Sequence, residues 1–235
     1  MDPEKFYDDL WQAEDRGSRH PTAQRDWFHR LVLDPIFDPT ANPRPEVALS
    51  LLQGGQRLLD IGCWDGGFLK RVQRAGLYTE LCGVDVVGDG VESARDKGFE
   101  THVVDLNRDP LPYPDEHFDG VALLAVLEHV FDPHTMIREV HRILRPGGEL
   151  VIDVPNASSL TNRIRILFGR IPVTSDDPGW DGGHLHYFTK HALDGFLRKE
   201  GFEILARKTT GGSSRQREWW LSLLAGELIY RCRRI

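Results

Sequence analysis

The sequence has few cysteines and no long apolar run. Three cysteines occur among 235 residues, Cys63, Cys82 and Cys232, and no two of them form a Cys-x-x-Cys pair. This count predicts neither a disulfide framework nor a cysteine zinc site, so we expect a chain that works reduced, in the cytoplasm. No stretch approaches the ~20 apolar residues of a membrane span, and the charged N-terminus lacks the apolar core of a signal peptide.

The sequence also lacks a net positive charge. The formal net charge is −7 and the pI is near 5.8, whereas a protein whose main partner is nucleic acid needs clustered Lys and Arg. We therefore expect a small-molecule partner and no nucleic acid. A chain that is 40% hydrophobic and 28% charged can bury a core of its own, and its length fits one main domain.

A proline-rich stretch marks the expected domain boundary. Residues 34–46, DPIFDPTANPRPE, contain four prolines between a polar N-terminal segment and the main body. We predict a helical cap and linker over residues 1–45 and the main domain over residues 46–235. No internal repeat or low-complexity tract interrupts this division.

The main domain alternates between two kinds of segment. Short apolar runs predict strands, and segments with helical spacing separate them; the runs are 57–62, 80–87, 100–106, 118–127 and 148–155. Residues 134–144 place apolar side chains on one helical stripe that ends at Arg-Pro-Gly-Gly. Such alternation predicts a doubly wound α/β fold with a parallel sheet covered on both faces, whose ligands bind at the carboxyl ends of the strands.

A glycine turn follows the first predicted strand. In DIGCWDGGF, residues 60–68, Gly62 and Gly66 permit a tight turn ahead of a helix N-terminus, which can hold an anion. A dinucleotide fingerprint would run from Gly62 to Gly67 and would need a glycine at position 64, where Trp64 stands. Because an indole would obstruct a pyrophosphate, a ligand with only a small carboxylate, such as S-adenosylmethionine, fits better.

Acidic residues end three predicted strands in succession. Asp85 is placed to accept hydrogen bonds from both ribose hydroxyls, and Val86 after it would lie along an adenine face. Asp105 would accept from the adenine amine while Leu106 packs on the ring. Each aspartate alone is more often a helix cap or turn residue, but Asp60, Asp85 and Asp105 in this order favour an adenosyl ligand.

These segments resemble the class I S-adenosylmethionine-dependent methyltransferases of the small bacterial type. LLDIGCWDGGFL, GVDVV, VVDLN, FDGVALLAVLEHVFDP and RILRPGGELVIDVPN match that family's motifs in order, over roughly residues 55–156. GGHLHYFTKHALDGFLRKEGFEIL is similar to a subgroup that methylates small molecules. The resemblance implies a Rossmann-like fold with a mostly parallel seven-stranded sheet and an antiparallel last strand.

The resemblance also implies a cofactor site. The residues expected to bind S-adenosylmethionine are Asp60, Gly62, Cys63, Trp64, Gly66, Asp85, Val86, Asp105, Leu106, Leu124 and Ala125.

Candidate catalytic residues follow the fourth predicted strand. His129 could remove a proton from an acceptor hydroxyl, or it could pack beside the next helix, and Glu128 would orient its neighbours. In the ubiquinone-ring O-methyltransferases, a second acid three residues before this Glu helps to hold magnesium. Ala125 occupies that position here, so we expect no metal.

A second histidine pair lies in an expected acceptor lid at about 156–189, a long connection of the kind that often covers a site. On an extended backbone, His184 and His186 point one way and Leu185 and Tyr187 the other. The pair could bind substrate or act as base. A zinc pair is the sharper alternative, but the sequence offers no evident third ligand.

The C-terminal stretch has two interpretations. Residues 207–235 hold seven Lys or Arg against two Glu, around an apolar run with two Trp, which suits an anionic membrane surface. The favoured interpretation is a last helix and a final strand. The sequence as a whole predicts no oligomeric state.

The function expected from these features is methyl transfer from S-adenosylmethionine to a small molecule, with a hydroxyl of a sugar or another metabolite favoured. An NAD-dependent oxidoreductase and a non-catalytic cofactor-binding module are the alternatives.

Overall fold

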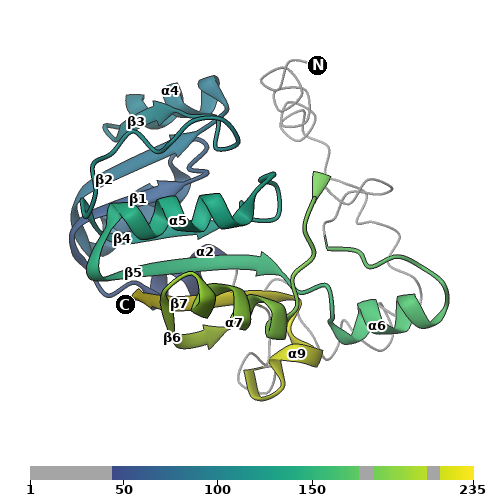
Figure 1. The fold of residues 1–235 in the computed structure, drawn as a ribbon. Coiled ribbons are helices and arrows are strands. Elements are labelled where there is room, and N and C mark those ends of the chain that lie inside the picture. Colours follow the sequence, from purple (N-terminus) through teal and green to yellow (C-terminus); the bar gives the residue numbers. More distant parts are fainter. Residues whose placement is uncertain (1–43, 175–182, 211–217) are drawn as a thin grey trace.

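A seven-stranded sheet forms the centre of the protein. The computed structural model describes residues 44–174, 183–210 and 218–235. The strand order is β3-β2-β1-β4-β5-β7-β6 (Figure 1). The strands are β1 (Gly55–Ile61), β2 (Tyr78–Asp85), β3 (Glu100–Val103), β4 (Phe118–Leu124), β5 (Leu144–Pro155), β6 (Phe202–Lys208) and β7 (Glu227–Arg234).

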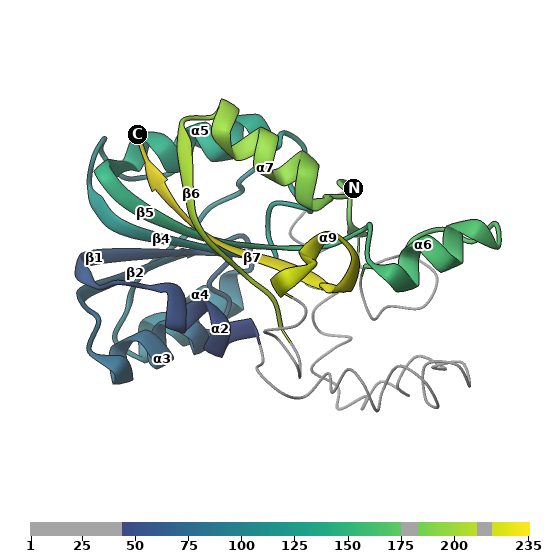
Figure 2. The same cartoon turned by 90° about the horizontal axis from the view of Figure 1, so that it is seen from below.

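Helices cover both faces of this sheet. One face carries α2 (Arg44–Leu51), α3 (Gly67–Ala75) and α4 (Gly88–Asp96), and the opposite face carries α5 (Pro133–Ile143) and α7 (Lys190–Lys199) (Figure 2). Beyond the carboxyl end of β5 lie α6 (Leu160–Leu167) and α9 (Leu221–Leu224) (Figure 1). None of the described helices is long and apolar enough to cross a membrane.

The strand directions confirm the expected fold class. β1 pairs in parallel with β2 and β4, β2 with β3, and β4 with β5, whereas β7 runs antiparallel to both β5 and β6. The central strands are buried on both faces, since Leu58, Leu59 and Ile61 of β1 are fully inaccessible to solvent. Continuous apolar strands of this kind require helices on both sides, which explains the doubly wound arrangement.

The helix expected over 134–144 is α5. The side chain of Asp132 accepts hydrogen bonds from the first turn, Pro133 occupies the first helical position, and the apolar stripe through Ile137 and Val140 is buried. Leu144 lies in β5 and not in the helix. The Arg-Pro-Gly-Gly sequence therefore lies inside β5, where the pairing with β4 shifts register between Phe118 and Gly120.

The sheet creates a crevice between β1 and its two neighbours. After β1 the chain moves outward to β2 and β3, then returns to β4 on the other side of β1. Connections that leave in opposite directions open a space at the carboxyl ends of β1 and β4, where ligands bind in folds of this type.

Parts of the expected domain organisation lie outside the described residues. Residues 1–43 of the N-terminal cap and residues 175–182 of the acceptor lid are among them. Within the described part of the lid, α6 follows β5, and Ala157 donates a backbone hydrogen bond to Phe188. The division at residues 45 and 46 remains a prediction.

The C-terminal stretch ends as a short helix and a sheet strand, as its favoured interpretation expects. β7 is paired on both sides. Trp219 and Trp220, just before α9, are 86% and 53% exposed. A membrane contact through this segment remains a prediction.

Candidate active site

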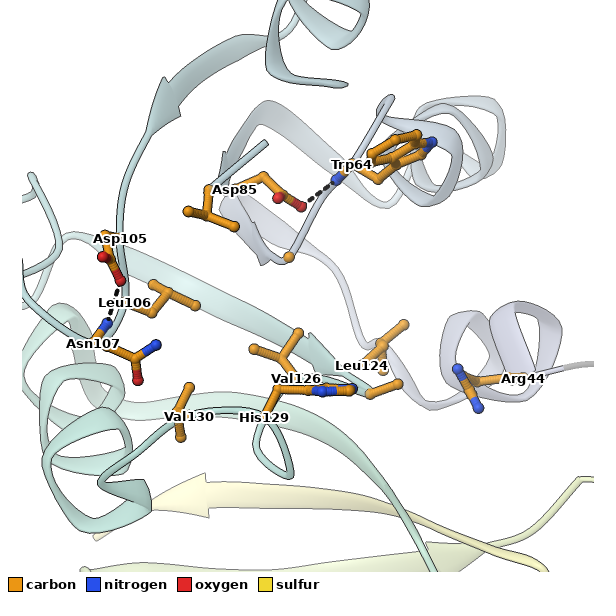
Figure 3. Close-up of a pocket in the computed structure, with 13 residues that line it drawn as sticks. Arg44, Trp64, Asp85, Asp105, Leu106, Asn107, Leu124, Val126, His129 and Val130 are labelled. Atoms are coloured by element: carbon orange, nitrogen blue, oxygen red, sulfur yellow. Dashed lines mark hydrogen bonds between the residues drawn. The ribbon is translucent and has the colours of Figure 1, made fainter. Parts of the chain in front are cut away.

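A cavity opens at the crevice (Figure 3). It is lined by Arg44, Gly62, Trp64, Asp85, Val86, Asp105, Leu106, Asn107, Leu124, Ala125, Val126, His129 and Val130. Nine of these residues were expected from the sequence, all but Arg44, Asn107, Val126 and Val130. Among the other expected residues, Asp60, Cys63 and Gly66 lie around the glycine turn. Glu128 and His184 lie beside His129, whereas the ring of His186 contacts the backbone of Val130.

The glycine turn has the left-handed backbone that its glycines permit. The φ angles are 78° at Gly62 and 75° at Gly66, which is the N-cap of α3. A β-carbon at Gly62 would collide with a methyl group of Val126 across the crevice. The amides of Gly62 and Cys63 donate to the carbonyl of Val84, which ties the turn to the end of β2. Both glycines are thus required for the shape of the turn.

Trp64 is accommodated by a change of direction in this turn. Its φ is 45°, and its indole packs against Gly90 in the first turn of α4. Its amide donates to the Oδ2 atom of Asp85 at 2.8 Å (Figure 3). In a dinucleotide site the backbone here approaches the pyrophosphate. A carboxylate already accepts this amide, which weighs further against a dinucleotide.

Asp85 joins the turn to the end of β2. Its Oδ1 atom accepts from the amide of Val87 at 3.0 Å. Burial raises the pKa of Asp85, and the hydrogen bonds from Val87 and Trp64 oppose that rise. Asp60 is more deeply buried, and burial together with the nearby charge of Asp85 raises its pKa well above the usual range. Asp60 is therefore buried and does not line the cavity, whereas Asp85 does.

An apolar slot separates Asp85 from Asp105. Val86, Leu106 and Val130 contribute apolar side chains to the cavity lining. Asp105 accepts from the amide of Asn107 at 3.0 Å, and the Asn107 side chain accepts from the amide of Phe131 at 2.7 Å. Asn107 was missed although it directly follows the Asp105-Leu106 pair. It links the ends of β3 and β4 and closes this side of the cavity.

Arg44 lies at the opposite end of the cavity from Asp105 (Figure 3). Its Nε atom is 2.7 Å from Oδ2 of the fully buried Asp153, and it also pairs with Glu227. Although burial opposes it, the charges of Asp153 and Glu227 raise the pKa of Arg44, so this side chain stays cationic. No local pattern in the sequence indicated it, because Arg44 stands in the proline-rich stretch interpreted as a linker.

Glu128, His129 and His184 form a compact group beside the cavity. The rings of His129 and His184 are 4.7 Å apart, and Oε1 of Glu128 lies 4.0 Å from Nε2 of His184. Burial and the neighbouring His184 lower the pKa of His129 to about 4, so this imidazole is neutral at pH 7. Burial raises the pKa of Glu128 to about 7 against the attraction of Arg44. His129 is the member that lines the cavity.

Residues 184–187, the histidine segment, are held against the turn after β4. The amides of Leu185 and His186 both donate to the carbonyl of Glu128, at 2.8 and 3.2 Å. The Nε2 atom of His186 is 2.9 Å from the carbonyl of Val130, while Leu185 and Tyr187 are about half exposed. This matches the expected alternation. The imidazole of His186 is engaged with the backbone and does not line the cavity.

Known proteins resemble this chain in sequence and in fold. A family model described as a methyltransferase domain matches residues 23–207. The ubiquinone biosynthesis O-methyltransferase of Ruegeria pomeroyi is 32% identical over 158 residues, 66% of this chain and 62% of that protein. The 27-O-demethylrifamycin SV methyltransferase of Amycolatopsis mediterranei is 37% identical over 107 residues, 43% of this chain and 39% of that protein. The chain spans about half the length of the curated relatives that it matches.

Solved structures share the fold at low identity. The N-methyltransferase NodS of Bradyrhizobium japonicum, in complex with S-adenosylhomocysteine, has a TM-score of 0.57 and 18% identity, covering 96% of this chain and 98% of its own. An S-adenosylmethionine-dependent methyltransferase of Mesorhizobium loti has a TM-score of 0.59 and 20% identity, covering 80% and 97%. With the matched family model and the observed strand order, the conclusion is that the chain belongs to the class I S-adenosylmethionine-dependent methyltransferases.

Proposed function

We propose that the protein transfers the methyl group of S-adenosylmethionine to a hydroxyl of a small molecule, such as a sugar or another metabolite. The observation that carries this proposal is the arrangement of the cavity. Two carboxylates stand on either side of an apolar slot at one end, and an arginine and a histidine lie toward the other end. This polarity matches a ligand with an adenosine at one end and an amino acid at the other.

The adenosine would occupy the slot between Asp85 and Asp105. Asp85 would accept hydrogen bonds from the two ribose hydroxyls, and Val86 and Leu106 would pack on the adenine faces. Asp105 would accept from the adenine amine. The strand ends fix all four residues, so this half of the site exists before the ligand arrives, which lowers the cost of binding.

The methionine end would lie beside the glycine turn and the end of β4. Leu124 and Ala125 line the cavity there, and the φ of Ala125 is 55°, which turns the backbone sharply after the strand. Carbonyl groups at this bend would accept from the methionine ammonium. Arg44 would pair with the methionine carboxylate, since it is the one cationic side chain among the described residues that line the cavity.

The reaction asks the protein mainly to align two groups and to exclude water. The acceptor oxygen uses a lone pair to form the new bond to the methyl carbon as the carbon–sulfur bond breaks. The electron pair of the broken carbon–sulfur bond remains on sulfur. The acceptor also loses its hydroxyl proton. We assign this deprotonation to the group of Glu128, His129 and His184, with His129 nearest the cavity, and we assign to His186 the role of positioning the segment.

Calorimetry tests the proposal. S-adenosylmethionine and S-adenosylhomocysteine should bind the full chain with one site each, and NAD should not bind. Incubation with labelled cofactor and fractionated small-molecule extracts should then transfer label to a hydroxyl compound. Binding of NAD without S-adenosylmethionine would overturn the proposal in favour of an oxidoreductase, and cofactor binding without transfer to any acceptor would favour a non-catalytic module.

A further inference from the structure

Three potential metal ligands converge behind the cavity. Glu128 and His129 come from the turn after β4, and His184 comes from the segment before α7. One donor atom from each side chain lies within 4.8 Å of the other two. The sequence separates Glu128 from His184 by the whole of β5 and α6, so folding alone unites them. His184 therefore meets Glu128 and His129. The zinc pair of His184 and His186 does not form, because the ring of His186 contacts the carbonyl of Val130 instead.

The buried carboxylate of Glu128 lacks a hydrogen-bond donor. The residue is 1% exposed, and no other described residue donates a hydrogen bond to either of its oxygen atoms. Asp153, a buried carboxylate nearby, also accepts no hydrogen bond from the described residues, but it has the cation of Arg44 at 2.7 Å. A buried carboxylate without a partner is costly, and a bound cation would satisfy both of its oxygen atoms. A cation bound by all three side chains would therefore stabilise the buried carboxylate of Glu128.

The neighbours of the two histidines hold them as metal ligands are commonly held. The Nδ1 atom of His184 is 2.7 Å from the hydroxyl of Thr174, while its Nε2 atom is directed toward Glu128. The backbone of Gly183 lies within hydrogen-bonding reach of the ring of His129. Outer-shell bonds of this kind orient the imidazole rings around a metal and are nearly as important as the ligands themselves.

We propose that Glu128, His129 and His184 bind one divalent transition-metal ion of the zinc type. Two imidazoles and one carboxylate are a donor set that suits Zn²⁺ or Co²⁺, whereas Mg²⁺ prefers oxygen ligands. With bonds of about 2.0–2.2 Å, tetrahedral donors lie about 3.4 Å apart, so the side chains need to move inward by roughly 1 Å. Three protein ligands leave a coordination position open, as in catalytic zinc sites.

A metal ion bound here would activate the acceptor for the proposed methyl transfer. This catalytic role rests on the proposed function, whereas the binding of the metal does not. A Lewis acid beside His129 would lower the pKa of the acceptor hydroxyl. The O–H bond would then break with its proton passing to water at the mouth of the cavity. An oxygen lone pair would form the bond to the methyl carbon, and the C–S electrons would stay on sulfur. The bound ion would then promote the deprotonation that we assign to this group, with His129 as a ligand, whereas His129 would be the base only in the absence of a metal.

Metal binding can be measured apart from catalysis. Full-length protein stripped with a chelator should bind one equivalent of Zn²⁺ by calorimetry, and Co²⁺ should give the visible spectrum of a nitrogen- and oxygen-ligated tetrahedral ion. Glu128→Gln and His184→Ala should each weaken Zn²⁺ binding by at least about 100-fold, more than the ~10–100-fold cost of losing an outer-shell partner. Thr174→Val should cost about 10-fold.

A matched control is His102→Ala, which removes a half-exposed histidine far from the group along the sheet order. It should leave Zn²⁺ binding unchanged. Thermal melting of each apo variant separates loss of a ligand from loss of the fold, and the nearly isosteric Glu128→Gln guards against misfolding of His184→Ala. Tighter binding of Mg²⁺ than of Zn²⁺, no stoichiometric binding, or unchanged binding in both ligand variants would overturn the proposal.

Titration with S-adenosylmethionine on the same samples keeps the two proposals apart. Binding of the cofactor without any metal would reject the metal site and leave the proposed function standing. Stoichiometric Zn²⁺ binding without cofactor binding would reject the proposed function and leave the metal site standing.

Discussion

The side of the cavity proposed to hold the cofactor (the cofactor side) and the side proposed to hold the acceptor (the acceptor side) are built in different ways. On the cofactor side, Gly62, Asp85 and Asp105 each lie within two residues of a strand end, and parallel pairing sets their positions. On the acceptor side, His184 reaches Glu128 through a segment held by backbone hydrogen bonds to the turn after β4. The cofactor side is thus part of the sheet, whereas the acceptor side is attached to it. We expect substitutions on the two sides to affect different measurements.

The largest expected effect is on the cofactor side. Asp85→Asn should lower the affinity for S-adenosylmethionine by about 100-fold, because a charged acceptor for two ribose hydroxyls is replaced by a neutral one. Calorimetry measures the affinity, and Asp89→Asn, at an exposed position in α4, is the matched control. A loss of methyl transfer with unchanged cofactor affinity would place Asp85 on the acceptor side of the cavity.

The next effect separates backbone strain from collision in the glycine turn. Gly62→Ala should lower the free energy of unfolding by about 2 kcal/mol or more, since it combines a left-handed backbone with a clash against Val126. Gly76→Ala, with φ of 65° and nothing near the added β-carbon, should cost about 1 kcal/mol from the backbone alone. Urea denaturation of both variants measures the difference. Equal losses of unfolding free energy would show that Val126 moves aside without cost.

The cofactor side was largely predictable because its signals are local. An acidic residue at the end of an apolar run can be read without knowing the rest of the fold, and Asp85, Asp105 and the glycine turn were found in this way. Trp64 suggested an obstructed turn, but its indole packs on Gly90 and its amide meets Asp85. Whether a side chain turns toward or away from a ligand depends on neighbours that one strand end does not reveal.

The acceptor side could not be predicted for a complementary reason. The meeting of His184 with Glu128 depends on the path of the chain from β5 through α6, and no periodic pattern encodes that path. Arg44 was missed in the same way, since its ion pairs with Asp153 and Glu227 join three distant parts of the sequence. A proline-rich stretch looks like a linker until its tertiary partners are known.

A smaller effect concerns α7, the helix that follows the histidine segment. Asp194 of α7 accepts hydrogen bonds from Arg207 of β6 and from Lys190, and these lower its pKa although burial opposes them. A carboxyl whose folded-state pKa is depressed contributes stability above its unfolded pKa, near 4, and loses it as the pH falls through the folded value. Asp194→Asn should therefore cost about 1–2 kcal/mol at pH 7 and progressively less below pH 4.

Urea denaturation from pH 7 to pH 2 tests this dependence. The curves of the wild type and of Asp194→Asn should converge as the pH falls, and cofactor affinity at pH 7 should stay the same in both. Glu203→Gln, which alters an exposed pair with Arg233, is the control and should change the stability little at any pH. A constant difference between Asp194→Asn and the wild type across this range would exclude the ion pairs as the cause.

The smallest expected effect tests what Trp64 contributes. Trp64→Gly completes the Gly-x-Gly-x-x-Gly pattern from Gly62 to Gly67, yet it should change the affinity for S-adenosylmethionine by less than about 3-fold, or about 0.7 kcal/mol. The indole packs on Gly90, and the amide at position 64 would still donate to Asp85. NAD should remain unbound, because that carboxylate still occupies the amide that a pyrophosphate would approach. Calorimetry with both ligands decides the point: NAD binding by the variant would mean that the indole alone excludes the dinucleotide, and that the adenosyl preference of this turn depends on one side chain.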